Sequence, residues 1–315
     1  MNTFHLKRHI LGRQPSVQLS KDEFDDLLAA HRRIRDHLAV EELFDVLMRN
    51  YEEFERELLS LALRSGTFMG AFEDWIEAID AVQLVGRRLS NLLTTTHAYC
   101  DQIPHSLSAL FGRSSGELAQ VREYFREEHS GSFGYRVCTE LRKYAQHRGT
   151  PVHQLNRHMS WISRPDGSRV HVHWIVPQVS VSRLRDDATL KSGVLADLEV
   201  GATDTAAGNR FQDLRPYVRN YISCLGRIHL KVRALVRTSI AKADTTIVGA
   251  IDRFVASCGP EVSGLSVVEL NDRMLIEDRH PTFIMREPIE RRIALERRNH
   301  SPTRLDTQVV TNEII

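Results

Sequence analysis

The chain has 315 residues, of which 42% are hydrophobic and 26% are charged, and its formal net charge is +1. These values are typical of one large or two ordinary globular domains and exclude the low-hydrophobicity composition of a disordered chain. A total charge near zero demands neither a nucleic-acid nor an anionic-membrane partner. It still permits a local basic surface, because the field depends on how charges are arranged.

The four cysteines are far apart in the sequence, at Cys100, Cys138, Cys224 and Cys258. This spacing predicts free thiols in a reducing compartment and not a disulfide framework. The N-terminus lacks the apolar run of a signal peptide, and no stretch approaches the ~20 apolar residues of a membrane span. We therefore expect a cytoplasmic protein with no membrane partner.

The first third of the chain is patterned as two long helices. Residues 21–64 contain no proline and keep apolar residues at helical spacing, and Ser20 followed by Glu23 is the signature of a capping box. A second helix is expected over 72–101, with Pro104 breaking it.

Two shorter helices come next. Ser115 opens the first, which ends at 130–132, and the second ends at 149–151, where a glycine stop precedes a proline that cannot continue a helix. The second helix carries one apolar stripe, made of Tyr135, Cys138, Leu141, Tyr144 and Ala145. We expect residues 153–158 to lie on a further helix.

The pattern changes near residue 162. The sequence from Pro165 to Ser168 is typical of a turn, and apolar and polar residues then alternate from Arg169 to Val176. This alternation predicts a β-hairpin inserted among helices.

The remainder is expected to be helical over about 183–199 and 210–256, with short strands in 261–285 and a polar helix and loose tail after Arg286. The fold class is therefore mostly α, a helical bundle with a β-hairpin insert and a small mixed C-terminal region. The expected divisions are 1–160, the helical bundle; 161–182, the hairpin insert; 183–258, its helical continuation; 259–290, short strands; and 291–315, the polar helix and tail.

The best functional clue is the basic end of the second short helix, where Arg142 and His147 lie within Leu141–Gly149. An arginine separated from a later histidine by four to six residues occurs six times in the chain, so spacing alone selects nothing. The other pairs are Arg32/His37, Arg122/His129, Arg148/His153, Arg164/His171 and Arg273/His280. Context selects Arg142/His147, because this pair ends an apolar-striped helix that stops sharply.

The stretch resembles the signature of the HEPN superfamily, an Arg-x4-6-His motif on a late helix of an all-helical bundle. Arg142 and His147 match its Arg-x4-His form, whereas Lys143 departs from the polar residue that usually follows the arginine. The resemblance covers the motif helix and its helical setting, but not the hairpin or the region after 260. It implies a metal-independent ribonuclease of a toxin–antitoxin or phage-defence system, working as a dimer whose two motifs meet in a shared cleft.

Chemistry leads to the same assignment of roles. Cleavage of RNA by its own 2′-hydroxyl requires proton movement, which a histidine near neutral pKa performs, and a charged group that steadies the phosphorane. Arginine holds phosphate oxygens bidentately and never loses its charge. His147 is thus the candidate general acid/base and Arg142 the candidate phosphorane ligand. The candidate substrate contacts are Lys143, Tyr144, Arg148 and His153.

Helix geometry constrains this site. Five residues along a helix of ~3.6 residues per turn place Arg142 and His147 about 140° apart, so they do not share a face. Either the helix unwinds near His147, or the arginine and histidine of different protomers complete one site around a two-fold axis. The competing interpretation is structural: Arg142 pairs with Glu140 or a neighbouring helix, and His147 caps the C-terminal carbonyls.

Other polar groups carry weaker signals. His171 and His173 have the spacing of a metal pair on one strand face, but Asp166 is the only nearby acid, so a polar outer face competes with a metal site and no metal is predicted. His153 and His158 either line the RNA cleft or are solvated. The arginine-rich segment 286–304 is either a basic arm on RNA or, preferably, a helix laced with salt bridges.

Two function hypotheses follow. The first is an endoribonuclease without cofactor or metal that acts on RNA as a homodimer, and an antitoxin or another regulatory protein is a candidate partner. The second is a non-catalytic helical module that binds RNA, a nucleotide or a protein partner.

Overall fold

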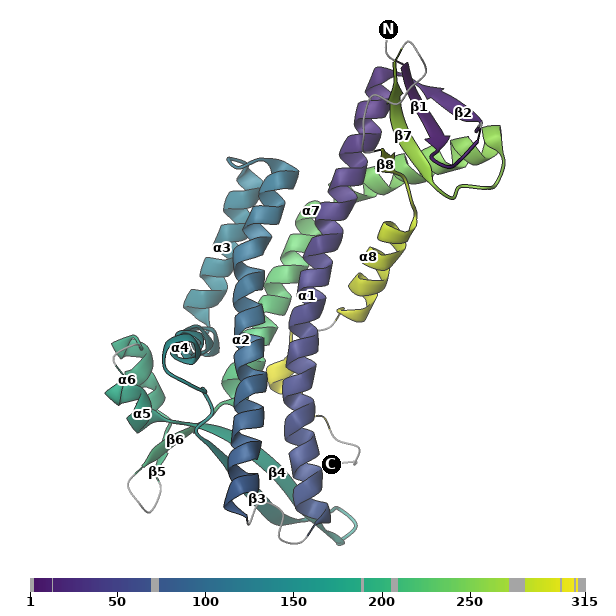
Figure 1. The fold of residues 1–315 in the computed structure, drawn as a ribbon. Coiled ribbons are helices and arrows are strands. Elements are labelled where there is room, and N and C mark those ends of the chain that lie inside the picture. The colour runs from purple at the N-terminus through teal and green to yellow at the C-terminus, as the bar shows by residue number, and fades with distance from the viewer. Residues whose placement is uncertain are drawn as a thin grey trace. The chain divides into compact units, whose positions relative to one another are not determined.

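The computed structural model confirms a mostly α fold with an inserted β-hairpin (Figure 1). The part of the chain that it describes contains eight α-helices and two four-stranded antiparallel sheets. The chain divides into two compact units, which are described separately. The described residues are 3–12, 14–68, 74–187, 190–204, 209–271, 281–300, 302–308 and 310.

The first unit comprises Met1–Leu43, Ile103–Leu118 and Lys231–His300. Its sheet has the order β2-β1-β7-β8. The sheet packs with the N-terminal part of α1 and the C-terminal part of α7 around one apolar core, in which Leu6, Phe24 and Phe254 are buried. Its elements are β1 (Thr3–Arg8), β2 (Ser16–Leu19), β7 (Leu265–Leu270), β8 (Thr282–Phe283), α8 (Glu287–Arg298) and parts of α1 (Lys21–Thr67), α2 (Trp75–Phe111) and α7 (Arg215–Cys258).

The second unit comprises Phe44–Gln102, Ala119–Leu230 and Ser301–Ile315. Its sheet has the order β3-β4-β6-β5, and its interior contains Tyr99, whose hydroxyl lies 2.9 Å from Nδ1 of the buried His229. Phe44 stacks on the same imidazole. Besides the rest of α1, α2 and α7, its elements are α3 (Gly116–Gly131), α4 (Phe133–His147), β3 (Gln154–Ser163), β4 (Arg169–Ser180), α5 (Val181–Asp186), α6 (Ser192–Val200), β5 (Thr203–Asp204), β6 (Arg210–Asp213) and the 3₁₀ turn η1 (Leu305–Thr307).

The predicted long helices are confirmed, but the expected break at Pro104 is wrong. The capping box of α1 is present: the Ser20 N–H donates to Glu23 at 2.7 Å, and the Glu23 N–H donates to the Ser20 hydroxyl at 3.1 Å. Helix α2 continues through Pro104 to Phe111. A proline inside a helix removes one backbone hydrogen bond, and burial of Ile103 and Leu107 on either side of it favours the helix despite that loss.

The hairpin is longer than predicted. Strand β3 begins at Gln154, so Asn156, Arg157 and His158 lie on a strand and the expected helix over 153–158 is wrong. Ten residue pairs join β3 to β4, with Trp161 opposite His171. The turn is as predicted, because the Arg164 N–H donates to the Ser168 carbonyl and Gly167 adopts a positive φ of 84°.

Other regions also differ from the sequence prediction. Strands β1 and β2 were not foreseen, the described part of the predicted helix over 183–199 contains the short helices α5 and α6, and 210–213 form β6 before α7 begins. Strands β1 and β6 pair with segments distant from them in the sequence, so local periodicity does not reveal them.

The C-terminal segment combines a predicted and an unpredicted feature. Helix α8 carries salt bridges, as the preferred interpretation of segment 286–304 predicts. Arg292 pairs with Asp244 and Glu296, and Arg286 pairs with Asp252. The described residues 302–308 contact α7, because the Leu305 N–H donates to the Ser223 hydroxyl at 3.0 Å. None of the described helices is both long enough and apolar enough to cross a bilayer.

Candidate functional site

Helix α4 carries the predicted motif as a regular, well-capped element. The Ser132 hydroxyl accepts the Tyr135 N–H at 3.1 Å at its start, and Tyr135, Cys138, Leu141 and Tyr144 are buried along one stripe. At its end the Arg148 N–H donates to the Tyr144 carbonyl at 2.9 Å. The helix is thus fixed in the unit by its apolar face, and its basic residues project from the remaining surface.

Arg142 and His147 differ from the other basic residues near the end of α4 in their side-chain contacts. Arg142 is half-buried and His147 is exposed at the last position of α4. Neither side chain forms a hydrogen bond or an ion pair within the part of the chain that the structure describes. Glu140 pairs with Lys143, and a backbone N–H caps the helix end, so neither contact of the structural interpretation is made.

Lys143 and Arg148, by contrast, are held by acidic partners. Lys143 Nζ lies 2.8 Å from the carboxylate of Glu140, whose side chain is 3% exposed. Residues three apart share a helix face, whereas residues two apart do not, which explains why Glu140 selects Lys143 over Arg142. Arg148 Nε lies 3.1 Å from Asp187, just after α5. A role in binding substrate would require both cations to exchange these partners.

Tyr144 and His153 bind each other. His153 Nδ1 accepts the Ser180 N–H at 3.0 Å, so its proton resides on Nε2, which lies 3.1 Å from the Tyr144 hydroxyl. Burial, with a contribution from the nearby Arg183, lowers the pKa of His153 to about 4. Burial also raises the pKa of Tyr144. His153 is therefore neutral near pH 7 and joins the end of α4 to the hairpin.

The helix does not unwind before His147, so the first of the two geometric alternatives is absent. Helix α4 includes every residue from Phe133 to His147. The offset of about 140° between Arg142 and His147 follows for a helix of ~3.6 residues per turn. Within one chain these side chains leave the helix in different directions and do not converge on a single phosphate.

The two histidines on strand β4 of the hairpin contact each other. His173 Nε2 lies 2.9 Å from His171 Nδ1, and the His173 pKa is lowered, first by burial and then by His171 and Arg157. Across the described ranges, only His37, Glu41 and Glu296 bring three potential metal ligands together, within 4.8 Å. Arg233 occupies both oxygens of Glu41, which makes this group an ion-pair network.

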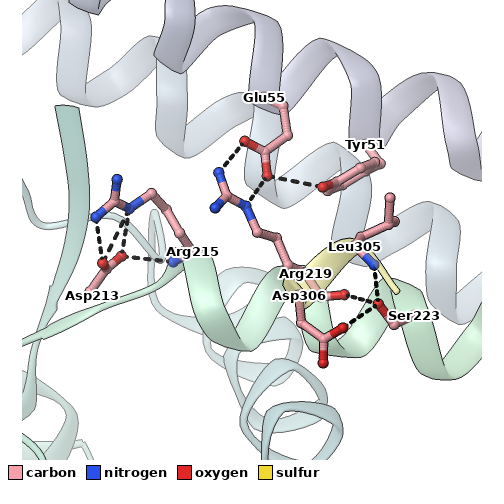
Figure 2. A network of polar contacts seen from close by, with 8 residues as sticks. All are labelled: Tyr51, Glu55, Asp213, Arg215, Arg219, Ser223, Leu305 and Asp306. Atoms are coloured by element: carbon pink, nitrogen blue, oxygen red, sulfur yellow. Dashed lines mark hydrogen bonds and ion pairs between the residues drawn. The ribbon is translucent and has the colours of Figure 1, made fainter. Parts of the chain in front are cut away.

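A second polar region lies around the first turns of α7 (Figure 2). Arg219 donates to both oxygens of Glu55 at 2.7 and 2.8 Å, and Tyr51 donates to the same carboxylate. Arg215 contacts Asp213, and Ser223 donates to Asp306 (Figure 2). This network joins α7 to α1 and to η1, and each of its arginines has a carboxylate partner.

An open cleft of about 470 Å³ lies beside that network, where α3, α4 and α7 meet. Arg227 on its wall donates to both oxygens of Glu128 at 2.9 and 2.6 Å. Arg227 is the only cation among the described residues that line the cleft, and because its charge is paired it is not available to a phosphate. Its remaining lining comes from Glu127, Gly131, Ser132, Phe133, Gly134, Pro216, Tyr217 and Asn220.

Comparisons with protein-family models, with curated proteins and with solved structures found no match for this chain. The candidate site therefore rests on its own geometry. The sequence singles out Arg142 and His147, which have no partner among the described residues, but it does not give the partners of the other four candidates. The Glu140–Lys143 pair has a detectable signal, an acid and a base three residues apart, whereas Asp187 and Ser180 come from distant parts of the sequence.

Proposed function

We propose that this chain is a metal-independent endoribonuclease that acts as a homodimer, with Arg142 and His147 as its reacting residues. The observation that carries the proposal is selective: the fold pairs Lys143 with Glu140 and Arg148 with Asp187, while Arg142 and His147 have no partner among the described residues. A half-buried arginine and an exposed histidine without acidic partners are available to a phosphate, and RNA supplies both the phosphate and the internal nucleophile.

In the proposed reaction, His147 accepts the proton of the 2′-hydroxyl while the 2′-oxygen forms a bond to phosphorus. The bond from phosphorus to the 5′-oxygen breaks, and the proton passes to that leaving oxygen. Arg142 binds the non-bridging oxygens, where negative charge accumulates in the phosphorane. The products are a 2′,3′-cyclic phosphate and a 5′-hydroxyl.

The homodimer is proposed because a straight α4 separates the two reacting residues. A two-fold axis beside α4 would place Arg142 of one chain near the partner subunit's His147, and the reverse pair would form a second site. The exposed end of α4 is also a surface that an antitoxin-like or other regulatory partner would cover. Arg183, which lies close enough to lower the pKa of His153, adds positive charge that favours binding of the RNA backbone.

The test is cleavage of a labelled single-stranded RNA in excess chelator. We expect wild-type protein to cleave it, and Arg142→Ala and His147→Ala to lose at least ~100-fold in rate, the usual contribution of a general acid/base. Arg122→Ala and His105→Ala, which alter an exposed arginine and an exposed histidine outside α4, serve as matched controls and should retain activity.

Product ends decide the mechanism. Cyclic phosphate and 5′-hydroxyl ends are expected from attack by the 2′-hydroxyl. Activity that requires a divalent ion, or fragments with 5′-phosphates, would reject this chemistry. RNA binding without cleavage would favour the second function, a non-catalytic RNA-binding module.

A further inference from the structure

Hairpin β3–β4 presents basic and aromatic side chains that the proposed reaction does not use. Between Gln154 and Ser180 the sequence has three arginines and three histidines but one acid, Asp166. The Asp166 carboxylate accepts the N–H and the hydroxyl of Ser168 at 2.8 and 2.7 Å, so it is occupied within the turn. The basic residues of this strand pair are Arg157, Arg164, Arg169, His158, His171 and His173.

One face of the hairpin arranges these groups in a row. Trp161 lies opposite His171 and Ser163 lies opposite Arg169, and residues at alternate positions share a face. The His171 ring stacks on Trp161 with centroids 4.7 Å apart, and the Arg169 guanidinium lies over the Trp161 ring at 5.6 Å. Trp161 remains 57% exposed despite these contacts.

The row is exposed toward the turn and covered at its other end. The His173 ring lies against α1, because a Cβ added at Gly66 would be 3.4 Å from it. Trp161, His171 and Arg169 lie beyond this contact and are exposed. The opposite face repeats the arrangement once, since His158 stacks on Trp174 at 5.2 Å with nearly parallel rings.

We propose that this hairpin is a binding surface for single-stranded RNA, with Trp161 as a stacking platform for a base and Arg169 as a phosphate contact. An unpaired base exposes its flat face to an aromatic ring, whereas the bases of a duplex are stacked on one another and withheld. A base would take the place of Arg169 on Trp161, and the released guanidinium would reach the adjacent phosphate. The positive charge of Arg169 complements the RNA backbone.

The choice of RNA as ligand rests on the proposed function, but the surface is made of residues outside α4. Binding and cleavage can therefore be measured separately. The Arg142→Ala/His147→Ala double variant keeps the RNA intact while the hairpin is tested.

The experiment measures the anisotropy of a fluorescein-labelled 12-nucleotide oligouridylate, and of a duplex RNA of equal length, with this double variant as background. The single strand should bind more tightly than the duplex. Adding Trp161→Ala should weaken binding of the single strand about tenfold, within the usual range for one base–aromatic stack. Adding Arg169→Ala should reduce the slope of log affinity against log salt by about 0.7.

Two matched controls separate the hairpin from general surface effects. Trp75→Ala removes a tryptophan that is 75% exposed on α2, and Arg122→Ala removes an exposed arginine on α3; both should leave affinity unchanged. Circular dichroism of each variant shows whether it is folded, and Trp161→Phe, which keeps an aromatic ring, should restore most of the affinity.

If adding Trp161→Ala to the double variant leaves its affinity for the single strand unchanged, the inference is overturned. It is also overturned if Trp161→Ala abolishes self-association but not RNA binding. If wild-type protein cleaves RNA but Trp161 has no influence on binding, the inference fails and the proposed function stands. If the hairpin binds RNA that the wild-type protein never cleaves, the inference stands and the proposed function fails.

Discussion

Each compact unit contains an arginine and a histidine close together on its helices. The two sets differ in burial and in whether a carboxylate pairs with the arginine. In the first unit His37 and Glu41 are 2% and 0% exposed, and Arg233 donates to both oxygens of Glu41 at 2.9 and 2.6 Å. In the second unit Arg142 and His147 lie at the surface of α4 without an acidic partner among the described residues.

His37 of the buried group also follows an arginine, Arg32, at the separation that His147 has from Arg142. Arg32, however, donates to the Leu28 carbonyl of its own helix, and His37 faces the interior beside Glu41. Burial with a carboxylate makes a charged group part of the folded structure, whereas exposure without one leaves it available to a ligand. The contacts, and not the spacing, distinguish the two.

The largest expected effect is on the stability of the buried group. Glu41→Ala should reduce the free energy of unfolding by ~3–5 kcal/mol, because Arg233, with a side chain 13% exposed, would keep its charge without its main partner. Arg142→Ala and His147→Ala should each change it by less than about 0.5 kcal/mol, as surface substitutions do. Urea unfolding followed by circular dichroism measures all three.

Similar losses for Glu41→Ala and Arg142→Ala would break the comparison. In that case Arg142 would be a structural residue, and a loss of cleavage in its variant would no longer indicate a role in the reaction.

The helical half of the fold is predictable from local sequence. The capping box at Ser20 and Glu23 and the glycine stop after His147 are signals within a few residues of the features they define. Strand β1 is different, because it pairs with β7 across more than 250 residues and has no comparable local signal. Pro104 predicts a helix end that does not occur, because burial of its neighbours outweighs the one backbone hydrogen bond that the proline removes.

The positions of the candidate residues, but not their contacts, can be predicted from the sequence. An amphipathic helix that ends at a glycine identifies where Arg142 and His147 lie, and the periodicity gives their offset. The pairing of Arg148 and His153 cannot be read from that helix, because their partners Asp187 and Ser180 come from other elements. Because Lys143, Tyr144, Arg148 and His153 all have partners, only Arg142 and His147 of the six candidates have none among the described residues.

A smaller effect is expected from His153, which joins α4 to the hairpin. Its folded pKa of about 4 is below the ordinary 6.5, so the unfolded chain binds a proton at higher pH than the folded chain. Its contribution to stability is complete above pH 6.5 and is lost as the pH falls toward 4.

We therefore expect the melting temperature to fall between pH 7 and pH 4.5, and to fall less in His153→Gln, which retains an acceptor and a donor without titrating. His105→Gln, at an exposed position, should behave as wild type. An identical pH dependence in His153→Gln and wild type would show that His153 is not the titrating link.

The most direct test of the composite site is to mix the two single variants. Arg142→Ala and His147→Ala should each be inactive alone, and after subunit exchange the mixture should recover about a quarter of the wild-type rate, since half of the dimers are mixed and each has one intact site of two. Sedimentation of the same samples establishes that they are dimers. A mixture that stays inactive although exchange is complete, or a fully active wild-type monomer, would contradict a site built from Arg142 of one chain and His147 of the other.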